Sequence, residues 1–453
     1  MIINKKIAIV GFGIEGVSCA NYLGVRNRIF IIDQKSKEQI DDDLWKKLKI
    51  KNIKFFWGSR MPKGLDVDFI VRSPGVGPEA AVVKKLLGKK TQITTLTNIF
   101  FDECPCPVIA VTGTKGKGTT ATLIYKILKE KFKGVFLAGN IGTPALDILS
   151  KLKKDSLAVL ELSSFQLLDL KKSPHLAVIL MVTTEHLDWH KDQDEYISAK
   201  KPIVLFQSKN DFAVVNADFA NSTKIARNIK SKIYYFSTKK RTNGVYLKGP
   251  RIVSEIESPE EICDVSKIRL VGKHNIENVL AAVAVSKIYS VQNDDIVKVL
   301  TTFKGLEHRL ELVGEKNQIR FYNDSFSTTP ETTIAAIESF DNKKILILGG
   351  SSKKSDFSAL SEKITKDSSI KALVLIGQEA ERIENSINDN GYFKGPVLKG
   401  AKNMEEIVKA AQKLAKPGYI VLLSPACASF DMFKNYKDRG EKFKTEVRKL
   451  KVT

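Results

Sequence analysis

TGTKGKGTT, residues 112–120, is the stretch that decides how the middle of this chain folds. It follows an apolar run at 108–111 and precedes a helix-like pattern at 121–128. Strand, glycine–lysine loop and helix make a phosphate-binding loop, in which backbone N–H groups and the helix N-terminus attract an anion and Lys117 adds a full charge. Val111 stands where the general pattern has glycine, and Gly118 where it has serine or threonine. A plain strand-to-helix turn is the alternative interpretation.

A second glycine motif lies near the start of the chain. GFGIEG, residues 11–16, separates an apolar strand pattern at 6–10 from a helical pattern at 17–23. The next strand, 29–32, ends at Asp33, which completes the fingerprint of a βαβ dinucleotide-binding unit. Because this geometry needs only a phosphate at a helix N-terminus, it suits a nucleotide sugar as well as NAD.

The rest of the chain alternates apolar strands with helical patterns, which predicts an α/β protein of three domains. We place the domains at 1–97, 98–303 and 304–453, with the Cys- and Pro-containing segment 98–107 as a linker. The first and third are expected to be Rossmann-like, and the second to be P-loop ATPase-like with a mixed or parallel sheet. Further strands are predicted at 66–71, 157–160, 176–182, 344–348, 372–376 and 419–423, and a helix at 275–288.

Composition narrows the class of protein. The net charge is +22, and 60 of the 73 basic residues are lysine, scattered along the chain. Nucleic-acid sites usually cluster their charge, so we expect no nucleic-acid partner, whereas anionic small substrates fit. No apolar stretch reaches the ~18 residues of a membrane span, which argues against membrane insertion. Five cysteines fit a reduced compartment, and we expect a cytoplasmic protein.

Several polar residues of the second domain follow predicted strands. Glu161 ends the strand at 157–160 and is placed to hold Mg²⁺ against phosphates, although a carboxylate that only caps the next turn would look the same. His186 and His190 are four residues apart with Glu185 between them, which suits a metal site or a chance neighbourhood. Local spacing does not single out Lys200, because most lysines are solvated.

The third domain has polar loops after three of its strands. Asp324 follows one strand, Gly349 and Gly350 end another, and SPACAS, residues 424–429, follows the last. Arg309 can reach a phosphate or pair with neighbouring glutamates. Ligands of parallel sheets bind at the carboxyl ends of strands, so these loops indicate a binding face, although each alone could be a turn.

Taken in order, the motifs of the whole chain resemble the Mur ligase family. They are TGTKGKGTT, GNIGTP (139–144), ELSSFQL (161–167), TTEHLDWH (183–190) with AK ending at Lys200, GKHNIEN (272–278), GLEHR (305–309), YNDS (322–325), ILGG (347–350) and LSPACASFDMF (423–433). The first four occur across the family. SPACASFDMF, with ELSSFQL and GFGIEG, is similar to the members that add D-glutamate.

The resemblance implies a three-domain ATP-dependent amide ligase of peptidoglycan synthesis. Its substrates would be UDP-N-acetylmuramoyl-L-alanine and D-glutamate. The L-alanyl carboxylate would attack the γ-phosphate of ATP, and the amine of D-glutamate would then displace phosphate from the acyl phosphate. We expect a monomer whose domains close around the substrates.

The resemblance also assigns roles to residues. The catalytic residues would be Lys117, Glu161, His186 and Lys200. ATP would contact Gly113, Thr114, Lys115, Gly116, Lys117, Gly118, Thr119, Thr120, Asn275, Asn278, Arg309 and Asp324. The UDP-substrate would contact Ile14, Glu15, Asp33, Gln34, Ser73, Asn140, Gln166 and His186, and D-glutamate would contact Thr328, Lys353, Ser429 and Tyr436. Of two Mg²⁺ ions, one would bind Thr119 and Glu161, and the other His186 and Lys200, whose CO₂-derived carbamate would act as a carboxylate-like ligand.

Three positions depart from the family pattern. Gly118 shifts the metal-facing hydroxyl to Thr119, Phe326 stands where some relatives have lysine, and Tyr436 replaces a phenylalanine. The rival interpretations are a related ligase that adds another amino acid, as folylpolyglutamate synthases do, a non-catalytic nucleotide-sugar-binding protein, and an NAD-dependent oxidoreductase. The last leaves the loop at 112–120 unexplained.

Overall fold

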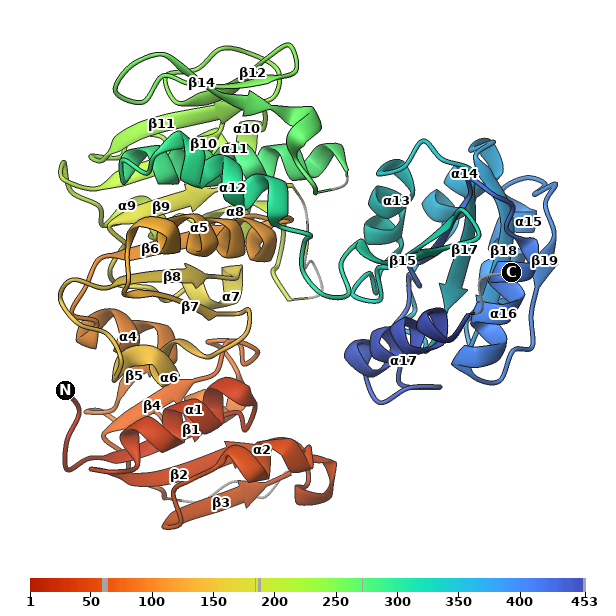
Figure 1. The fold of residues 1–453 in the computed structure, drawn as a ribbon. Helices are drawn as coiled ribbons and strands as arrows, with labels where there is room; N and C mark the ends of the chain where they lie inside the picture. The colour runs from red at the N-terminus through yellow and green to blue at the C-terminus, as the bar shows by residue number, and fades with distance from the viewer. Residues whose placement is uncertain (59–63, 184, 186–188, 271, 451–453) are drawn as a thin grey trace. The chain divides into compact units, whose positions relative to one another are not determined.

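The fold is known from a computed structural model that describes residues 1–58, 64–183, 185, 189–270 and 272–450 (Figure 1). The chain forms two compact units. The first consists of Met1–Ile268 with Ile276–Thr301, and the second of Arg269–Asn275 with Thr302–Thr453. Two of the three sheets belong to the first unit and one to the second.

The N-terminal sheet has five parallel strands in the order β3-β2-β1-β4-β5. Successive side chains of a strand point to opposite faces, and both faces are buried here: Ile7 and Ile9 pack on the side of α1, and Ala8 and Val10 on the side of α3. The strands are β1 (Lys6–Val10), β2 (Arg28–Asp33), β3 (Ile53–Trp57), β4 (Phe69–Arg72) and β5 (Gln92–Thr95), and the helices α1 (Ile14–Leu23), α2 (Asp42–Lys47) and α3 (Ala81–Leu86) with the 3₁₀ turn η1 (Lys37–Gln39). The Rossmann-like prediction is confirmed.

The predicted linker at 98–107 is wrong over most of its length, because α4 spans Leu96–Glu103. The side chain of Thr95 caps the helix by accepting from the amide of Asn98, and Ile99 and Phe100 are buried in the apolar core. Cysteine and proline mark only its end, so the connection to the central sheet is residues 104–107. The domain boundary at 97/98, which stays a prediction, falls inside this helix.

The central sheet has nine strands in the order β14-β13-β12-β11-β10-β9-β6-β8-β7. The pairs from β12 to β7 are parallel, and β12-β13 and β13-β14 are antiparallel, so the sheet is mixed. Its strands are β6 (Val108–Thr112), β7 (Val135–Gly139), β8 (Leu157–Glu161), β9 (Leu176–Ile179), β10 (Phe212–Asn216), β11 (Lys232–Ser237), β12 (Val245–Lys248), β13 (Arg251–Ser254) and β14 (Glu260–Asp264). β9 ends at Ile179, three residues before its predicted end at 182.

The helices of this part are α5 (Lys117–Lys131), α6 (Ala145–Leu149), α7 (Ser164–Leu167), α8 (Gln193–Ser198), α9 (Pro202–Leu205), α10 (Ala220–Ile225), α11 (Lys273–Ile288) and α12 (Asn293–Thr302), with the 3₁₀ turn η2 (Val265–Lys267). Helix α5 begins immediately after Gly116 and packs against β6, β7 and β8. The N-terminus of α5 therefore lies at the carboxyl edge of the largest sheet of the first unit, directly after β6 and the glycine loop.

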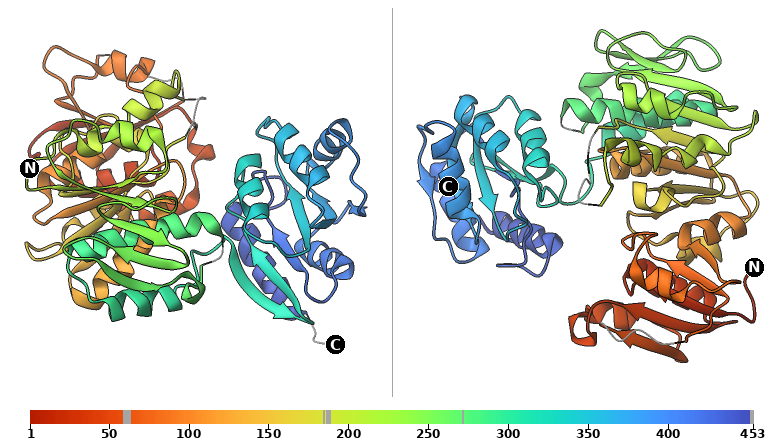
Figure 2. Two further views of the ribbon diagram at one scale, coloured as in Figure 1. Left: turned by 90° about the horizontal axis from the view of Figure 1, so that it is seen from above. Right: turned by 180° about the vertical axis from the view of Figure 1, so that it is seen from behind.

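The second unit is a six-stranded sheet with helices on both faces (Figure 2). The order is β15-β16-β20-β17-β18-β19, and only β15-β16 is antiparallel. Leu346 and Leu348 pack on the side of α13, α14 and α15, whereas Ile345 and Ile347 pack on the side of α16 and α17. The elements are β15 (Glu311–Lys316), β16 (Ile319–Asn323), α13 (Pro330–Glu338), β17 (Lys344–Gly349), α14 (Ser358–Lys366), β18 (Ile370–Ile376), α15 (Ala380–Asp389), β19 (Val397–Leu398), α16 (Met404–Leu414), β20 (Ile420–Leu423) and α17 (Tyr436–Lys449).

Among the described residues, no helix has the length and apolar character needed to cross a lipid bilayer. The predicted α/β class with three sheet-containing parts is confirmed.

Candidate functional site

The glycine–lysine loop joins buried β6 to α5 as predicted. Gly116 takes φ +86° immediately before the helix, and a Cβ there would lie 2.1 Å from Oδ1 of Asn278. Glycine is required on both counts. Asn278 of α11 also accepts from Oγ1 of Thr120 at 3.1 Å, which ties the first turn of α5 to α11. Asn275 lies three residues earlier on α11 and is buried as well.

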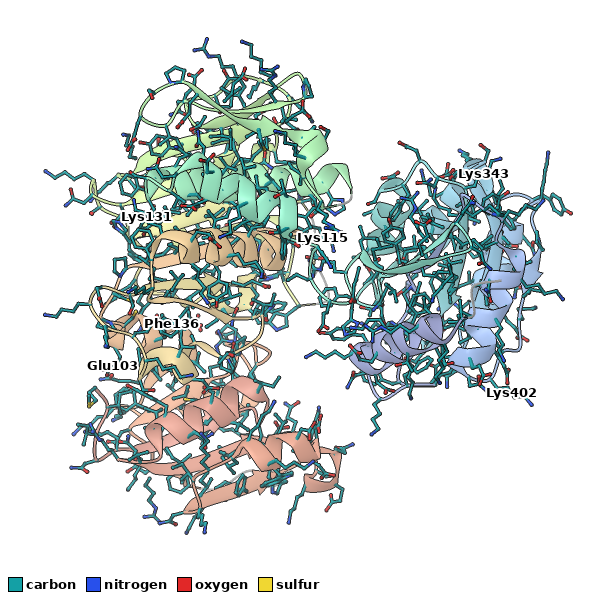
Figure 3. The ribbon with its side chains drawn as sticks, in the orientation of Figure 1. Glu103, Lys115, Lys131, Phe136, Lys343 and Lys402 are labelled. Atoms are coloured by element: carbon teal, nitrogen blue, oxygen red, sulfur yellow. The ribbon has the colours of Figure 1, made fainter. Side chains whose placement is uncertain are left out.

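Two lysines of the loop are held in place. Nζ of Lys117 donates to the carbonyl oxygens of Gly113, at 3.1 Å, and Thr114, at 2.9 Å, so its ammonium group lies over the loop. Lys115, labelled in Figure 3, pairs with Glu185 from the segment after β9. Together with the N-terminus of a 15-residue helix, these cations make the loop attractive to an anion.

Lys200 is the least expected member of the site. Its side chain is 1% exposed, yet Nζ reaches the carbonyl oxygen of Gly113 at 3.3 Å, the same atom that Lys117 contacts. Burial, and then the charge of Lys117, lower the pKa of Lys200 well below its usual value, while Glu185 opposes the shift. The centroid of the Tyr196 ring lies 4.4 Å from Nζ of Lys200. The Tyr196 hydroxyl is 3.0 Å from Oγ1 of Thr114. The fold therefore favours an uncharged amine beside the phosphate loop.

Glu161 ends β8 next to the strand that leads into the loop. It stands opposite Val111 in the parallel register, and Nδ2 of Asn140 donates to its Oε1 at 3.1 Å. Thr119, in the first turn of α5, is buried. His186 lies outside the described residues, whereas Nε2 of His190 is 3.0 Å from Oγ of Ser164.

The GFGIEG turn contacts the central domain through its glutamate. Nε2 of Gln166 donates to Oε1 of Glu15, and burial raises the pKa of Glu15 to about 7, against the opposing effect of that hydrogen bond. Gly16 is required because a Cβ there would lie 2.0 Å from the carbonyl oxygen of Gly11. Ile14 is 55% exposed at the start of α1 and is free for contact with a ligand of this turn.

Three further N-terminal residues were predicted to contact the UDP-substrate, and two of them form hydrogen bonds with the backbone of this turn. Asp33 accepts from the backbone amides of Phe12, at 2.7 Å, and Lys35, at 2.8 Å, so its carboxylate already holds the turn together. Gln34 is exposed. Oγ of Ser73 donates to the carbonyl oxygen of Gly11 at 3.2 Å.

Arg72 is a residue of this region that the sequence interpretation missed. Its side chain is fully buried, and Nε donates to Oδ2 of Asp169 at 3.0 Å, a partner 97 residues away. It also donates to the carbonyl oxygens of Ser73 and Val76, so it fixes the loop after β4. The sequence does show a basic residue at the end of an apolar strand, which could have drawn attention to Arg72. Its partner, Asp169, is too distant in the sequence to be inferred from a local pattern.

In the second unit, the loops after β16 and β20 are bound to each other. Oγ of Ser424 donates to Oδ2 of Asp324 at 2.8 Å, and burial raises the pKa of Asp324 to about 6. Fully buried Arg439, also missed, donates from Nε to Oγ of Ser325 at 2.9 Å and from Nη2 to the carbonyl oxygen of Cys427 at 3.1 Å. Two of the three polar loops predicted to form one face are thus brought together.

The residues predicted to contact D-glutamate differ in their exposure to solvent. Ser429 is buried, Thr328 is half-buried and Lys353 is exposed. Two of the three departures from the family pattern touch: the rings of Phe326 and Tyr436 meet edge to face with centroids 5.2 Å apart. The guanidinium carbon of Arg309 lies 4.3 Å from the centroid of the Phe326 ring, so a cation lies over this ring.

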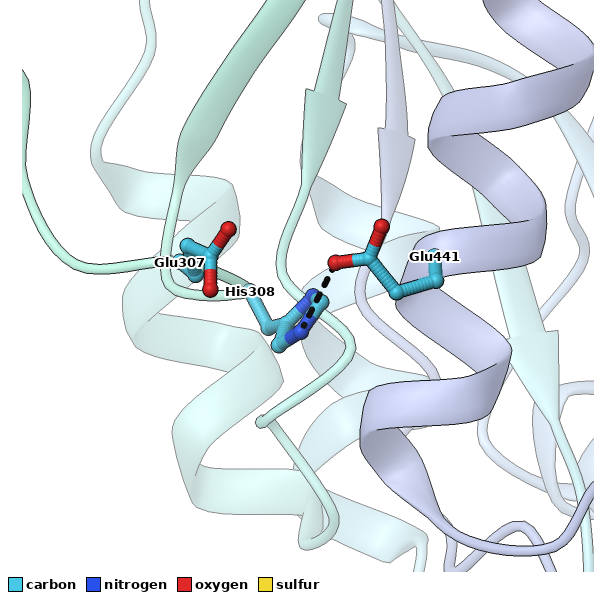
Figure 4. Close-up of side chains that lie close together, drawn as sticks. All are labelled: Glu307, His308 and Glu441. Atoms are coloured by element: carbon cyan, nitrogen blue, oxygen red, sulfur yellow. Dashed lines mark ion pairs between the residues drawn. The ribbon is translucent and has the colours of Figure 1, made fainter. Parts of the chain in front are cut away.

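Glu307, His308 and Glu441 come close enough to suggest a metal site (Figure 4). However, Nζ of Lys444 lies 3.1 Å from Glu307 and 2.7 Å from Glu441, so both carboxylates already pair with this cation. Nδ2 of Asn323 donates to Nδ1 of His308 at 2.9 Å, which leaves the ring proton on Nε2. Burial lowers the pKa of His308, so the ring is neutral within a structural charge network.

Three family models match consecutive parts of the chain. The N-terminal domain of MurD-like Mur ligases matches residues 5–95, the Mur ligase middle domain matches residues 111–286, and the glutamate ligase domain of Mur ligases matches residues 308–427.

Relatives named UDP-N-acetylmuramoylalanine–D-glutamate ligase match over the full length. The protein from Acetivibrio thermocellus is 41% identical, with 99% of this chain and 97% of the relative covered. The protein from Clostridioides difficile is 37% identical, with 99% of each chain covered.

Solved structures share the fold at lower identity. A pseudomurein peptide ligase type C from Methanothermus fervidus aligns with a TM-score of 0.59 at 18% identity, covering 99% of this chain and 100% of that one. The MurF ligase of Thermotoga maritima in complex with ADP aligns with a TM-score of 0.59 at 19% identity, covering 93% and 95%.

Proposed function

The chain belongs to the Mur ligase family, and we propose that it joins D-glutamate to UDP-N-acetylmuramoyl-L-alanine at the expense of ATP, in peptidoglycan precursor synthesis. The name carried by its full-length relatives supports this substrate pair. The structural observation that carries the proposal is the convergence of Lys117 and Lys200 on the carbonyl oxygen of Gly113. A simple turn has no use for two lysines there, whereas phosphoryl transfer needs cations and metal ligands at one point.

ATP would bind with its phosphates on the loop at 113–120. The amides at the start of α5 and the Lys117 ammonium would hold the outer phosphates, with Nζ exchanging its carbonyl partners for phosphate oxygens. Asn278, already bonded to Thr120, would fix the loop from the side of α11.

Magnesium fits the residues beside this loop. Glu161 offers a carboxylate at the end of the neighbouring strand, and Thr119 offers a hydroxyl from the first turn of α5. We assign a second ion to His186 and to a carbamate on Lys200. Because only the uncharged amine attacks CO₂, the lowered pKa of Lys200 supports this modification. When bound, the ions would offset the negative charge that separates phosphate from carboxylate.

The reaction would proceed in two displacements. The L-alanyl carboxylate attacks the γ-phosphorus of ATP, which gives an acyl phosphate and ADP, while Lys117 balances the growing charge on the phosphates. The amine of D-glutamate then attacks the acyl carbon and loses a proton, and phosphate leaves. Asn140 and Gln166, which already contact Glu161 and Glu15, would position the muramoyl peptide, so that the encounter costs less entropy.

Each of the three predicted domains would bind one substrate. Residues 1–97 would bind the UDP moiety through the GFGIEG turn, residues 98–303 would bind ATP, and residues 304–453 would bind D-glutamate through Thr328, Lys353, Ser429 and Tyr436. We propose that the protein acts as a monomer in the cytoplasm.

Phosphate release by the purified protein tests the proposal. The assay contains UDP-N-acetylmuramoyl-L-alanine, ATP and Mg²⁺, with D-glutamate, L-glutamate or L-lysine in parallel. Turnover with D-glutamate alone is expected. Turnover with L-lysine or L-glutamate instead would point to a ligase for another amino acid, and no phosphate release with any of them would favour a binding protein.

A further inference from the structure

Two thiols lie side by side in the short connection between α4 and β6. Cys104 follows the last residue of α4, and Cys106 comes two residues before β6. Their sulfur atoms are 3.6 Å apart and within hydrogen-bonding distance, and all five cysteines of the chain are free thiols. Glu103, labelled in Figure 3, marks the place in the fold. The family-wide motifs lie elsewhere, so the proposed ligase reaction does not use this pair.

The two thiols are not equivalent. Cys104 is half-buried and can meet a small reagent, whereas Cys106 is only 9% exposed and packs in the apolar core. The hydrogen bond from the Cys106 thiol lowers the pKa of Cys104 to about 7, and the same bond, with burial, raises the pKa of Cys106. Cys104 therefore has the properties of an attacking thiolate, and Cys106 those of a resolving thiol.

The other three cysteines lack these properties. Burial raises the pKa of Cys19, raises that of Cys427 to about 12, and raises that of half-buried Cys263. At neutral pH these side chains remain thiols and react slowly.

We propose that Cys104 and Cys106 form a redox-active dithiol that exchanges with low-molecular-weight disulfides. The Cys104 thiolate attacks one sulfur of a disulfide RSSR, a mixed disulfide forms, and RS⁻ leaves. The Cys106 thiol then loses its proton and attacks Sγ of Cys104, and the second RS⁻ leaves. The two cysteines are oxidised by two electrons to one disulfide, and RSSR is reduced to two RSH.

The geometry suits this exchange. The bond requires the sulfur atoms to approach from 3.6 Å to about 2.05 Å, a change that side-chain rotation in the four-residue connection 104–107 can supply. The pair lies at the amino end of β6, whereas the phosphate loop follows its carboxyl end. Five strand residues separate the two by about 16 Å. Oxidation is therefore expected to leave nucleotide binding intact.

The test is equilibration of the full-length protein in glutathione buffers of increasing oxidised fraction, followed by acid quenching, alkylation and mass spectrometry. The expected product carries two fewer alkyl groups, weighs two hydrogens less, and has Cys104 and Cys106 joined within one peptide; dithiothreitol restores both thiols. Alkylation of Cys104 at neutral pH should exceed that of Cys263 by at least about tenfold, with a midpoint near pH 7.

Variants identify the two roles. Cys106→Ser should stop at a glutathione adduct on Cys104, Cys104→Ser should remain unmodified at Cys106, and the control Cys263→Ser should behave as the parent protein. Full alkylation of both cysteines in the most oxidising buffer would overturn the proposal, as would a stable glutathione adduct in the parent protein. Neither readout uses the ligase substrates, so the result is independent of the proposed function.

Discussion

Lys200 shows how a side chain that we propose to act in catalysis can be unfavourable for stability. Its ammonium form is disfavoured because the fold removes it from water and places it next to Lys117. In the unfolded chain the amine is hydrated and protonated at neutral pH. Local sequence could not single out this lysine, because the carbonyl oxygen that it meets belongs to Gly113, 87 residues earlier.

Lys200→Met should abolish turnover without destabilising the protein. A lysine with a lowered folded pKa takes up a proton on unfolding, so the free energy of unfolding of the parent rises with pH from the folded pKa to the unfolded pKa near 10.5. Methionine removes this dependence. In CO₂-free buffer the variant should be at least as stable as the parent at pH 7, with a flatter pH profile, and turnover should fall by about 100-fold or more.

Urea unfolding between neutral pH and pH 10 and the phosphate-release assay measure the two effects. The exposed neighbour provides the matched control, Lys201→Met, which should preserve turnover. Turnover of Lys200→Met close to that of the parent, with or without bicarbonate, would contradict a role for the carbamate.

At the scale of the elements, the sequence was informative wherever a motif and its structure are local. The strand at 6–10, the phosphate loop and the helix after it are read within about ten residues, and the structure has them in place. The error at 98–103 had a local cause as well, since the cysteines and prolines at 104–107 hid a capped amphipathic helix. By contrast, Arg72 and Arg439 act on partners 97 and 114 residues away, which no local pattern reveals.

The Arg72–Asp169 pair joins the end of β4 to the segment after α7, and its loss should be costly. Arg72 is fully buried and Asp169 is 28% exposed, so Asp169→Ala leaves a guanidinium without its counter-charge inside the protein. Breaking a buried pair in this way is expected to lower the free energy of unfolding by about 3 kcal/mol. Urea denaturation measures the change. Glu362→Ala, which breaks an exposed pair with Lys366, should change stability by no more than about 0.5 kcal/mol, and an equal effect of both variants would refute the assignment.

The contact of α1 with α7 makes stability depend on pH through Glu15. Its pKa rises from 4.5 to about 7 on folding, so the folded protein binds the extra proton and the free energy of unfolding falls as pH rises through this window. Glu15→Gln keeps an oxygen that accepts from Gln166 but carries no charge. The variant should match the parent near pH 4 and exceed it by about 1–2 kcal/mol near pH 8, after allowance for partial exposure.

Thermal or urea unfolding across this pH range checks the prediction. Glu331→Gln is the matched control, because Glu331 is also in the first turn of a helix, α13, but is exposed. Glu331→Gln should lower the free energy of unfolding by a few tenths of a kcal/mol at neutral pH, because it removes a negative charge that interacts favourably with the helix dipole. If Glu15→Gln is less stable than the parent protein at pH 8, the surroundings stabilise the carboxylate and the prediction is wrong.

For the whole molecule, charge is the property that the sequence gives without any structure. The net charge of +22 is carried mostly by scattered lysines, and every substrate in the proposed reaction is an anion. A positive field increases the local concentration of such ligands and their rate of association, and salt screens it. The proposed chemistry takes place among buried groups, such as Lys200, whose interactions salt screens much less.

Ionic strength should therefore change substrate capture more than catalysis. Raising it from about 0.01 M to about 0.15 M shortens the Debye length from ~30 Å to ~8 Å. We expect KM for the UDP-linked substrate to increase at least about threefold, and kcat to change by less than about twofold, when ATP, Mg²⁺ and D-glutamate are saturating. Sucrose at matched osmolarity is the control and should leave both constants unchanged. If kcat falls as steeply as KM rises, salt acts on the bound complex, and long-range attraction by the lysine-rich surface is not what brings the substrate to the site.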